Sequence, residues 1–330
     1  MSDTLAVLGA GSWGTALAIA LARRGHTVRL WTLLAADADG MNALRVNAQF
    51  LPDIVLPPPL VATADLAAAL AGADGVLVAV PSSAFREVLE RVAPLLPGRD
   101  IAWATKGFEE DSGKLLHQVA VEALGEVACV AISGPSFAGE VALGLPTALA
   151  VASPDEAAAG RWVRRLHGDT LRAYRSDDLV GVQVGGAVKN VLAIAAGIAD
   201  GLGFGANARA ALITRGLAEV QRLGLALGAR RDTFLGLSGV GDLLLTCTDN
   251  QSRNRRVGLA LAEGKTLQQA VQALGQVAEG VVTARGVQRL AARLGVDMPI
   301  CGEVYRVLYE QHDVHRAVRE LLARDPSAEL

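Results

Sequence analysis

The chain has 330 residues, of which 51% are hydrophobic and only 4% aromatic. This length predicts two domains, and the composition favours an α/β or all-α architecture over a β-sandwich, with cores built from Ala, Leu and Val. The net charge of −3 argues against a general nucleic-acid or membrane-surface binder.

Cysteines, histidines and apolar runs narrow the class of protein further. The three cysteines are widely spaced and include no CxxC pair, so a disulfide framework or zinc site is not expected and a reducing compartment fits. The five histidines show no metal-like grouping, and no metal is expected. We find no signal-peptide pattern and no apolar run near the roughly 20 residues of a membrane span. We therefore expect a soluble, cytoplasmic protein.

The first half of the chain alternates short apolar runs with helical segments. Continuous apolar strands separated by helices predict a Rossmann-type doubly wound, mostly parallel sheet that is covered on both faces. Strands are expected at 5–8, 28–31, 75–80, 101–104, 128–132 and 148–151, helices at 13–24 and 85–92, and a Pro-rich loop at 52–59.

The second half is helical in its pattern and contains no convincing strand. We place the boundary between a first domain at 1–177 and an all-α domain at 178–330. The final residues, from about Asp325, are expected to be frayed. Helices are expected at 182–199, 206–227, 257–262, 267–274, 281–294 and 304–310.

A glycine-rich turn follows the first expected strand and opens the first helix. Its sequence, Gly9-Ala10-Gly11-Ser12-Trp13-Gly14, is a G-x-G-x-x-G. The first glycine permits a tight turn, the second lets a pyrophosphate approach the backbone, and the third lets helix and strand pack closely. We therefore expect the first domain to bind NAD or NADP at the helix N-terminus. The alternative is a plain turn whose glycines serve packing only.

The residues after the second strand leave the choice between NAD and NADP open. An acidic residue usually binds the adenine ribose at this place. Here the chain reads Trp31-Thr32-Leu33-Leu34, with no Asp or Glu before Asp37. Arg45 could reach a 2′-phosphate, although a solvated helix residue is the more ordinary interpretation.

Lys189 lies in a stretch, 185–191, that is apolar on almost every face. Burial of a lysine costs free energy unless the side chain is paired or can lose its proton. A desolvated lysine that titrates near neutral pH suits general acid/base chemistry at a carbonyl. A lysine that extends to solvent from a helix end is the alternative.

Polar groups also follow two expected strands, where the ligand crevice of a parallel sheet lies. Lys106 is placed there to meet a phosphate or carbonyl, unless it is an exposed loop lysine. Gly134 permits close approach of a ligand, and Ser136 could N-cap a helix whose amides point at an anion.

Three polar positions of the helical half are further candidates. Arg253, within the basic segment 252–256, has the fork-shaped guanidinium that matches a phosphate, although a solvated loop is the commoner case. Asp242 could cap a helix or hydrogen-bond a substrate hydroxyl. Glu279 could accept hydrogen bonds from a ribose or amide, or simply favour a helix start.

These segments, in this order, resemble bacterial NAD(P)-dependent glycerol-3-phosphate dehydrogenases over nearly the whole chain. The most specific part is the run 185–205, which includes Lys189 and Asn190 and continues through 212–217. Segments 9–16, 103–107, 133–138, 252–254 and 279–280 are also similar.

The resemblance implies a role for each candidate. Lys189 would protonate the carbonyl oxygen of dihydroxyacetone phosphate during reduction and act as the base in reverse, with Lys106 near the substrate and nicotinamide. The substrate would be held by Gly134, Ser136, Asp242, Ser252, Arg253 and Asn254. The dinucleotide would be contacted, beside Gly9, Gly11 and Gly14, by Ser12, Trp13, Lys106, Ala138, Arg253, Val277 and Glu279.

The resemblance also implies a homodimer that supplies glycerol 3-phosphate for glycerophospholipid synthesis. Two other functions stay open on the residues alone. One is a related two-domain hydroxy-acid dehydrogenase, because Arg253 would bind a carboxylate as well. The other is a non-catalytic protein that senses dinucleotides, although Lys189, Lys106 and Asp242 would then have no evident purpose.

Overall fold

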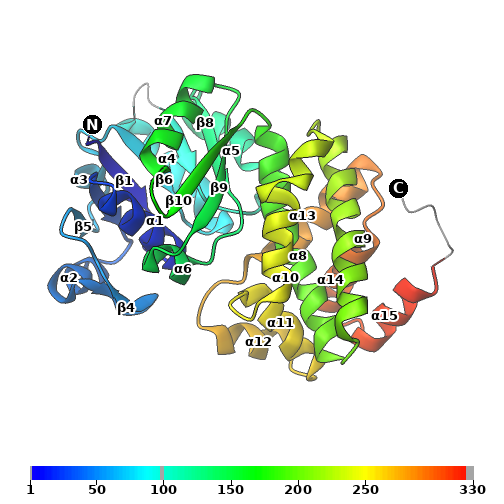
Figure 1. Ribbon diagram of the computed structural model, residues 1–330. Coiled ribbons are helices and arrows are strands. Elements are labelled where there is room, and N and C mark those ends of the chain that lie inside the picture. The colour runs from blue at the N-terminus through cyan, green and yellow to red at the C-terminus, as the bar shows by residue number, and fades with distance from the viewer. Residues whose placement is uncertain (1, 97–99, 325–330) are drawn as a thin grey trace. The chain divides into compact units, whose positions relative to one another are not determined.

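The computed structural model describes residues 2–96 and 100–324, and it divides into two compact units (Figure 1). The first consists of Met1–Thr105 and Leu116–Leu179, the second of Lys106–Leu115 and Val180–Leu330. The predicted division after residue 177 stays a prediction. The residues from Asp325, predicted to be frayed, lie outside the described residues.

The first unit is built on one eight-stranded sheet with the order β10-β9-β8-β7-β6-β1-β2-β5. Neighbouring strands are parallel except β8 and β9, which are antiparallel. The predicted doubly wound, mostly parallel sheet is therefore confirmed. Its strands are β1 (Thr4–Leu8), β2 (Thr27–Trp31), β5 (Leu60–Thr63), β6 (Gly75–Val78), β7 (Ile101–Trp103), β8 (Cys129–Ser133), β9 (Thr147–Ala152) and β10 (Leu171–Ser176).

The two edge strands, β5 and β10, are absent from the sequence-based prediction. Both alternate buried with exposed residues, so neither has the continuous apolar run of a strand buried on both faces. The predicted Pro-rich loop is wrong in part, because β4 (Leu51–Val55) pairs antiparallel with the short strand β3 (Val46–Asn47) in a separate two-stranded sheet.

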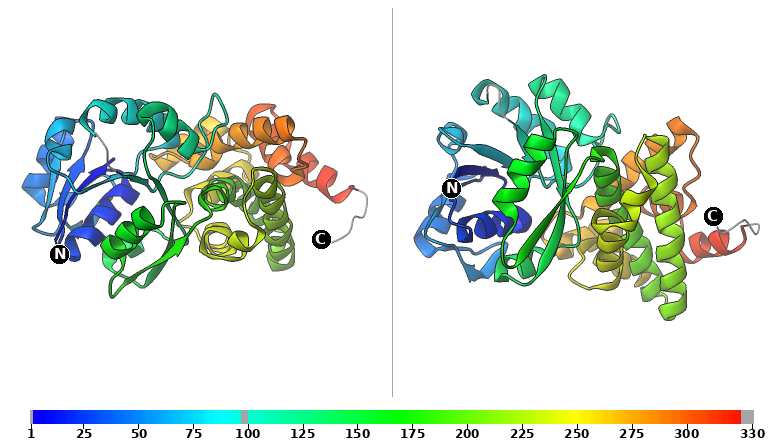
Figure 2. Two further views of the ribbon diagram at one scale, coloured as in Figure 1. Left: turned by 90° about the horizontal axis from the view of Figure 1, so that it is seen from above. Right: turned by 45° about the horizontal axis from the view of Figure 1, so that its top comes forward.

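Helices cover both faces of the eight-stranded sheet (Figure 2). On one face, α1 (Ser12–Arg23) packs against α6 (Ala138–Leu143) and lies beside α7 (Glu156–Leu166). On the other face, α4 (Phe85–Val92) packs with α5 (Leu116–Leu124). There the rings of Phe85 and Trp103 meet edge to face, with 5.7 Å between centroids. Because helices cover both faces and exclude water from them, the central strands are apolar throughout.

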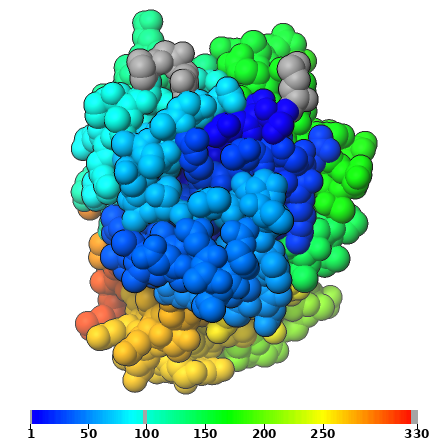
Figure 3. Space-filling view, turned by 90° about the vertical axis from the view of Figure 1, so that its left-hand side faces the viewer, coloured from blue at the N-terminus to red at the C-terminus, as the bar shows by residue number. Residues whose placement is uncertain are grey.

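Smaller helices complete the first unit. Beside β2 and β5 lie α2 (Ala35–Leu44) and α3 (Leu66–Leu70). Figure 3 shows the first unit from this side, where segments coloured in shades of blue form its surface. Single 3₁₀ turns cover Ser82–Ala84 and Ala93–Leu95.

The second unit is helical, and no strand lies in its described part beyond residue 179. The predicted helix at 257–262 begins earlier, because Ser252 caps the helix and its side chain accepts from the Arg255 amide at 3.2 Å. The helices are α8 (Leu179–Gly201), α9 (Gly205–Ala226), α10 (Asp242–Thr248), α11 (Arg253–Ala262), α12 (Leu267–Leu274), α13 (Glu279–Leu294), α14 (Pro299–Tyr309) and α15 (Val314–Leu322), with short helical turns at Arg231–Leu235 and Leu237–Gly241.

The core of the second unit forms around α8. By length and composition this helix could cross a membrane, but 94% of its most apolar stretch is buried inside the protein. Glycines let neighbouring backbones approach it closely. A side chain at Gly185 would overlap the Ser238 carbonyl, and one at Gly197 would overlap the Arg255 carbonyl. The close packing of two neighbouring segments against α8 therefore requires that Gly185 and Gly197 have no side chain.

We predict that Gly197→Ala lowers the free energy of unfolding by about 1–3 kcal/mol, because the new methyl group displaces the Arg255 backbone. The matched control is Gly302→Ala in α14, where the nearest neighbouring atom is 3.8 Å away. This control should be neutral or should stabilise the protein by up to about 1 kcal/mol. Urea unfolding followed by circular dichroism measures both. Equal stabilities of the two variants would contradict the packing argument.

Candidate functional site

Two lysine ammonium groups share one buried carboxylate in the second unit. Lys189 Nζ donates to Asp242 Oδ1 at 2.5 Å, and Lys106 Nζ donates to Asp242 Oδ2 at 2.7 Å. The exposed fractions of these side chains are 9% for Lys189, 1% for Asp242 and 14% for Lys106. The alternatives of a Lys189 that extends to solvent and a Lys106 exposed in a loop are therefore wrong.

Three separate elements deliver these groups. Lys189 comes from the buried middle of α8. Asp242 is the first residue of α10 and follows a glycine-rich turn in which Gly239 has a non-helical backbone. Lys106 begins the segment Lys106–Leu115, which follows β7 in the chain but belongs to the second unit. The site therefore depends on tertiary packing rather than on a local motif.

Thr246 completes the surroundings of the Lys189 ammonium and was not among the predicted residues. Its hydroxyl accepts from Lys189 Nζ at 2.8 Å and donates to the Asp242 backbone carbonyl at 2.6 Å. Thr246 lies one helical turn after Asp242 on α10, so the two side chains share a face. This spacing of four residues, once a helix start is placed at Asp242, is the sequence signal that could have identified it.

The environment of Lys189 changes its acidity. Burial lowers the pKa of Lys189 from 10.5 to about 8. The Asp242 carboxylate opposes this shift in pKa, and the Lys106 ammonium adds to it. A group with a pKa near 8 can release and regain a proton in neutral solution, which an ordinary lysine does far less readily. Lys189 is therefore suited to general acid/base chemistry.

The predicted phosphate-binding segment is not a solvated loop. Both Ser252 and Asn254 are buried. Asn254 Nδ2 donates to Asn190 Oδ1 at 2.9 Å, and Asn254 Oδ1 accepts from the Gly280 amide at 2.9 Å. This amide side chain thus joins the start of α11 to α8 and to the start of α13.

Arg253 and Glu279, both expected to contact the cofactor, lie near one another. Arg253 Nη1 donates to Gln276 Oε1 at 3.2 Å. Burial lowers the pKa of Arg253, and the charge of Glu279 raises it. Glu279 is the first residue of α13, so the predicted helix start is confirmed, and Val277, two residues before it, is 45% exposed. A guanidinium, a carboxylate and an exposed apolar side chain are grouped here.

The glycine turn of the first unit has the shape that a dinucleotide needs. Gly9 has a left-handed backbone (φ +114°), and a side chain there would lie 2.7 Å from the Ala79 carbonyl. A side chain at Gly14 would overlap the Gly9 carbonyl, whereas at Gly11 no described atom lies within 4 Å. The first turn of α1 has no side-chain cap, and Trp13 Nε1 is buried without a hydrogen-bond partner in the described chain. The uncapped backbone amides and the indole N–H are donors without partners, and such donors fit a pyrophosphate at the helix N-terminus.

Residues 32–34, which follow β2, carry neither a carboxylate nor a guanidinium of their own, but the Arg91 guanidinium of α4 lies over the Trp31 ring, 5.1 Å from its centroid. Leu33 and Leu34 are exposed. Arg45 donates to the carbonyls of Leu56 and Pro57 at 3.0 and 2.6 Å. Arg45 is therefore held against the backbone before β5 and is not a solvated helix residue, and residues 32–34 themselves carry no charge that separates NAD from NADP.

The segment after β8 differs from the prediction at one residue. Gly134 has a left-handed backbone (φ +142°), and a side chain there would lie 3.0 Å from the Ala148 carbonyl. The predicted helix-capping role of Ser136 is wrong. Its hydroxyl donates to the Gly134 carbonyl at 2.9 Å, and α6 begins at Ala138 with Phe137 as its cap residue. The serine hydroxyl is therefore turned back into the preceding turn.

Known proteins resemble this chain over its whole length. The family described as NAD-dependent glycerol-3-phosphate dehydrogenase matches residues 4–159 with its N-terminal part and 178–319 with its C-terminal part. A glycerol-3-phosphate dehydrogenase (NAD(P)+) of Thioalkalivibrio sulfidiphilus is 60% identical, with 98% of each chain covered. One from Halorhodospira halophila is 57% identical, covering 100% of this chain and 99% of the relative.

A crystal structure gives the same result for the fold. The glycerol-3-phosphate dehydrogenase from Coxiella burnetii is 50% identical and has a TM-score of 0.95, with 98% of this chain and 99% of the other covered.

We predict that Gly11→Ala raises the Kd for NADH by about 10-fold or more, because its methyl group occupies the space in which a pyrophosphate approaches the backbone. The unfolding free energy should change by less than about 0.5 kcal/mol, since no described atom meets the methyl group. Gly160→Ala in α7 is the control and should leave the Kd unchanged, while it is neutral or stabilises the helix by up to about 1 kcal/mol. Fluorescence titration with NADH gives the Kd. Unchanged NADH affinity in Gly11→Ala would exclude this turn as the pyrophosphate site.

Proposed function

Because this chain belongs to the NAD-dependent glycerol-3-phosphate dehydrogenase family, we propose that Lys189 is the general acid/base of its reaction. The chain is an NAD(P)-dependent oxidoreductase. A nicotinamide cofactor bound by the first unit would supply the hydride for C2 of the substrate during reduction and accept it in the reverse direction. Lys189 donates a proton to the carbonyl oxygen of dihydroxyacetone phosphate, which yields glycerol 3-phosphate, and it removes that proton in the reverse direction. The supporting observation is the buried ammonium, with a pKa of about 8, held by Asp242 and Thr246.

The geometry around Nζ supports a directed proton transfer. A protonated lysine has three N–H donors. One is directed to Asp242 and one to Thr246, so the third is placed to meet a substrate oxygen. Because the two partners fix the ammonium, the direction of the third donor is set before the substrate binds.

Lys106 has an electrostatic role in this proposal. Its ammonium donates to the second carboxylate oxygen of Asp242. This contact keeps a positive charge close to the carbonyl oxygen of the bound substrate. This charge stabilises the alkoxide that develops during reduction. It also contributes to the lowered pKa of Lys189.

The phosphate of the substrate is assigned to the start of α11. Arg253 offers a guanidinium there, and Asn254 and the hydroxyl of Ser252 are neighbouring donors. Gly134 and Ser136 of the first unit are proposed to contact the substrate as well. A dianionic phosphate near Lys189 favours the charged form of the lysine, so substrate binding prepares the proton donor.

The dinucleotide is assigned to the turn that Gly9, Gly11 and Gly14 shape. NADH and NADPH are both proposed as cofactors, because the residues after β2 carry no group that selects between them. The remaining proposed contacts come from Ser12, Trp13, Lys106, Ala138, Arg253, Val277 and Glu279.

In the cell, we propose that the enzyme acts as a cytoplasmic homodimer. Its product would supply glycerophospholipid synthesis. The chain belongs to the glycerol-3-phosphate dehydrogenase family, and its relatives carry that name. This function is therefore adopted over the two alternatives, a hydroxy-acid dehydrogenase and a non-catalytic dinucleotide sensor.

We predict that Lys189→Met lowers kcat for dihydroxyacetone phosphate reduction by a factor of about 100 to 10,000, because the proton donor is lost. NADH binding should persist. Lys265→Met, at an exposed lysine between α11 and α12, is the control and should be fully active. Turnover is followed by the absorbance of the reduced nicotinamide, and folding by circular dichroism. Near-normal turnover in a folded Lys189→Met variant would remove this residue from the mechanism.

The two reaction directions should respond to pH in opposite ways. Reduction needs the ammonium form of Lys189, so its kcat/KM should fall as pH rises through about 8. Oxidation of glycerol 3-phosphate needs the neutral amine, so its kcat/KM should rise over the same interval. Asp242→Asn, which removes the charge that favours the ammonium, should move both midpoints to lower pH in its residual activity. Midpoints near the ordinary lysine pKa of 10.5 would contradict the proposal.

A further inference from the structure

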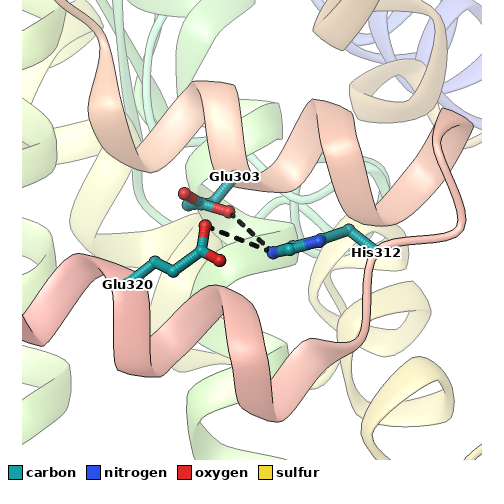
Figure 4. A group of neighbouring side chains, drawn as sticks. All are labelled: Glu303, His312 and Glu320. Carbon is teal, nitrogen blue, oxygen red and sulfur yellow. Dashed lines mark ion pairs between the residues drawn. The ribbon is translucent and has the colours of Figure 1, made fainter.

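A histidine and two glutamates converge between the last two described helices (Figure 4). Glu303 comes from α14, Glu320 from α15, and His312 from the turn that connects them. One ligand atom from each of the three residues lies within 4.8 Å of the other two. None of these residues belongs to the proposed catalytic or binding set.

The distances in this cluster are too long for hydrogen bonds. His312 Nε2 lies 3.7 Å from Glu303 Oε2 and 3.5 Å from Glu320 Oε2, whereas a hydrogen bond from a ring nitrogen is about 2.7–3.2 Å long. Two ligands placed tetrahedrally, each about 2.0–2.2 Å from a zinc ion, are separated by about 3.4 Å. The observed spacing therefore matches ligands that share a cation.

Two of the ligand atoms lack hydrogen-bond partners. Glu303 Oε2 and His312 Nε2 are both buried, and no described residue makes a hydrogen bond to either. The Glu303 side chain is only 9% exposed. Buried polar atoms are rarely left unpaired in folded proteins. The two atoms form an ion pair at 3.7 Å (dashed in Figure 4), but neither has a hydrogen bond, which indicates a missing ligand between them.

Arginines hold the two carboxylates in place. Arg306 donates to Glu303 Oε1 and lies 2.9 Å from Glu320 Oε2, while Arg316 donates to Glu320 Oε1 at 2.7 Å. A carboxylate oxygen has two lone pairs, so Glu320 Oε2 can accept from Arg306 and bind a cation as well. The two guanidinium charges offset the two carboxylate charges, so we expect moderate affinity for a cation.

The turn that carries the histidine is also fixed. Gln311 has a left-handed backbone (φ +55°), which is uncommon for a residue other than glycine. The His312 amide donates to the Arg306 carbonyl at 3.2 Å. The imidazole position is therefore set by the backbone as well as by its neighbours.

We propose that Glu303, His312 and Glu320 bind one divalent transition-metal ion, for which zinc is the best match. One imidazole nitrogen and two carboxylate oxygens are ligands that zinc accepts, with a fourth position left for water. The ion joins α15 to α14 and stabilises the C-terminal helix, because it binds the folded arrangement only. The residues spread from 303 to 320 without a metal-binding motif, which is why the sequence showed no metal-like grouping.

The test is calorimetric titration of the full chain, freed of metal by a chelator, with zinc chloride. We expect one saturable site per chain with a Kd on the order of micromolar. His312→Ala and Glu320→Gln should each weaken binding at least about 10-fold, a loss that matches removal of one ligand. The matched control is His315→Ala, because His315 is exposed on the same helix, α15. This variant should bind zinc like the unmodified chain.

Thermal unfolding provides a second readout. Zinc should raise the melting temperature of the unmodified chain and of His315→Ala, but not that of His312→Ala. Glu320→Gln keeps the test decisive if His312→Ala does not fold, since Glu320 is partly exposed. Absence of saturable zinc binding would overturn the proposal. Equal affinity in the unmodified chain and in both ligand variants would overturn it as well.

Discussion

One buried carboxylate that holds two ammonium groups joins three separate elements of the second unit at the candidate site. A single charge in this dry environment would be strongly destabilising. Asp242 with Lys106 and Lys189 instead forms a compact group with one net positive charge. Such a group still lacks part of its counter-charge, which an anionic substrate can supply. Stability and substrate attraction therefore have the same electrostatic origin.

The close packing around α8 makes this electrostatic arrangement possible. Gly185 and Gly197 allow neighbouring backbones to reach the helix, which excludes water from its middle, where Lys189 lies. Without this exclusion the lysine would be solvated and would keep an ordinary pKa. The acidity of one side chain is thus a consequence of two missing methyl groups on the same helix.

The sequence predicted those features that short-range patterns encode. The turn at Gly9 was predictable because glycine spacing specifies a backbone shape, and Lys189 stood out as a charge in an apolar helix. The edge strand β10 was missed because alternation is a weaker signal than a continuous apolar run. The three-residue contact of Lys106, Lys189 and Asp242 has no local signature, since tertiary packing alone creates it. The hydroxyl of Ser136 was placed wrongly because a carbonyl within its own turn competes with the helix amides.

The path of the chain after β7 limits how this protein can be divided into modules. The segment Lys106–Leu115 leaves the sheet, packs with the helical unit, and returns to the first unit at α5. A chimera that exchanged the whole N-terminal half with that of another dehydrogenase would also replace one of the two lysines. The two halves can therefore be recombined only where the incoming half supplies a lysine that reaches Asp242.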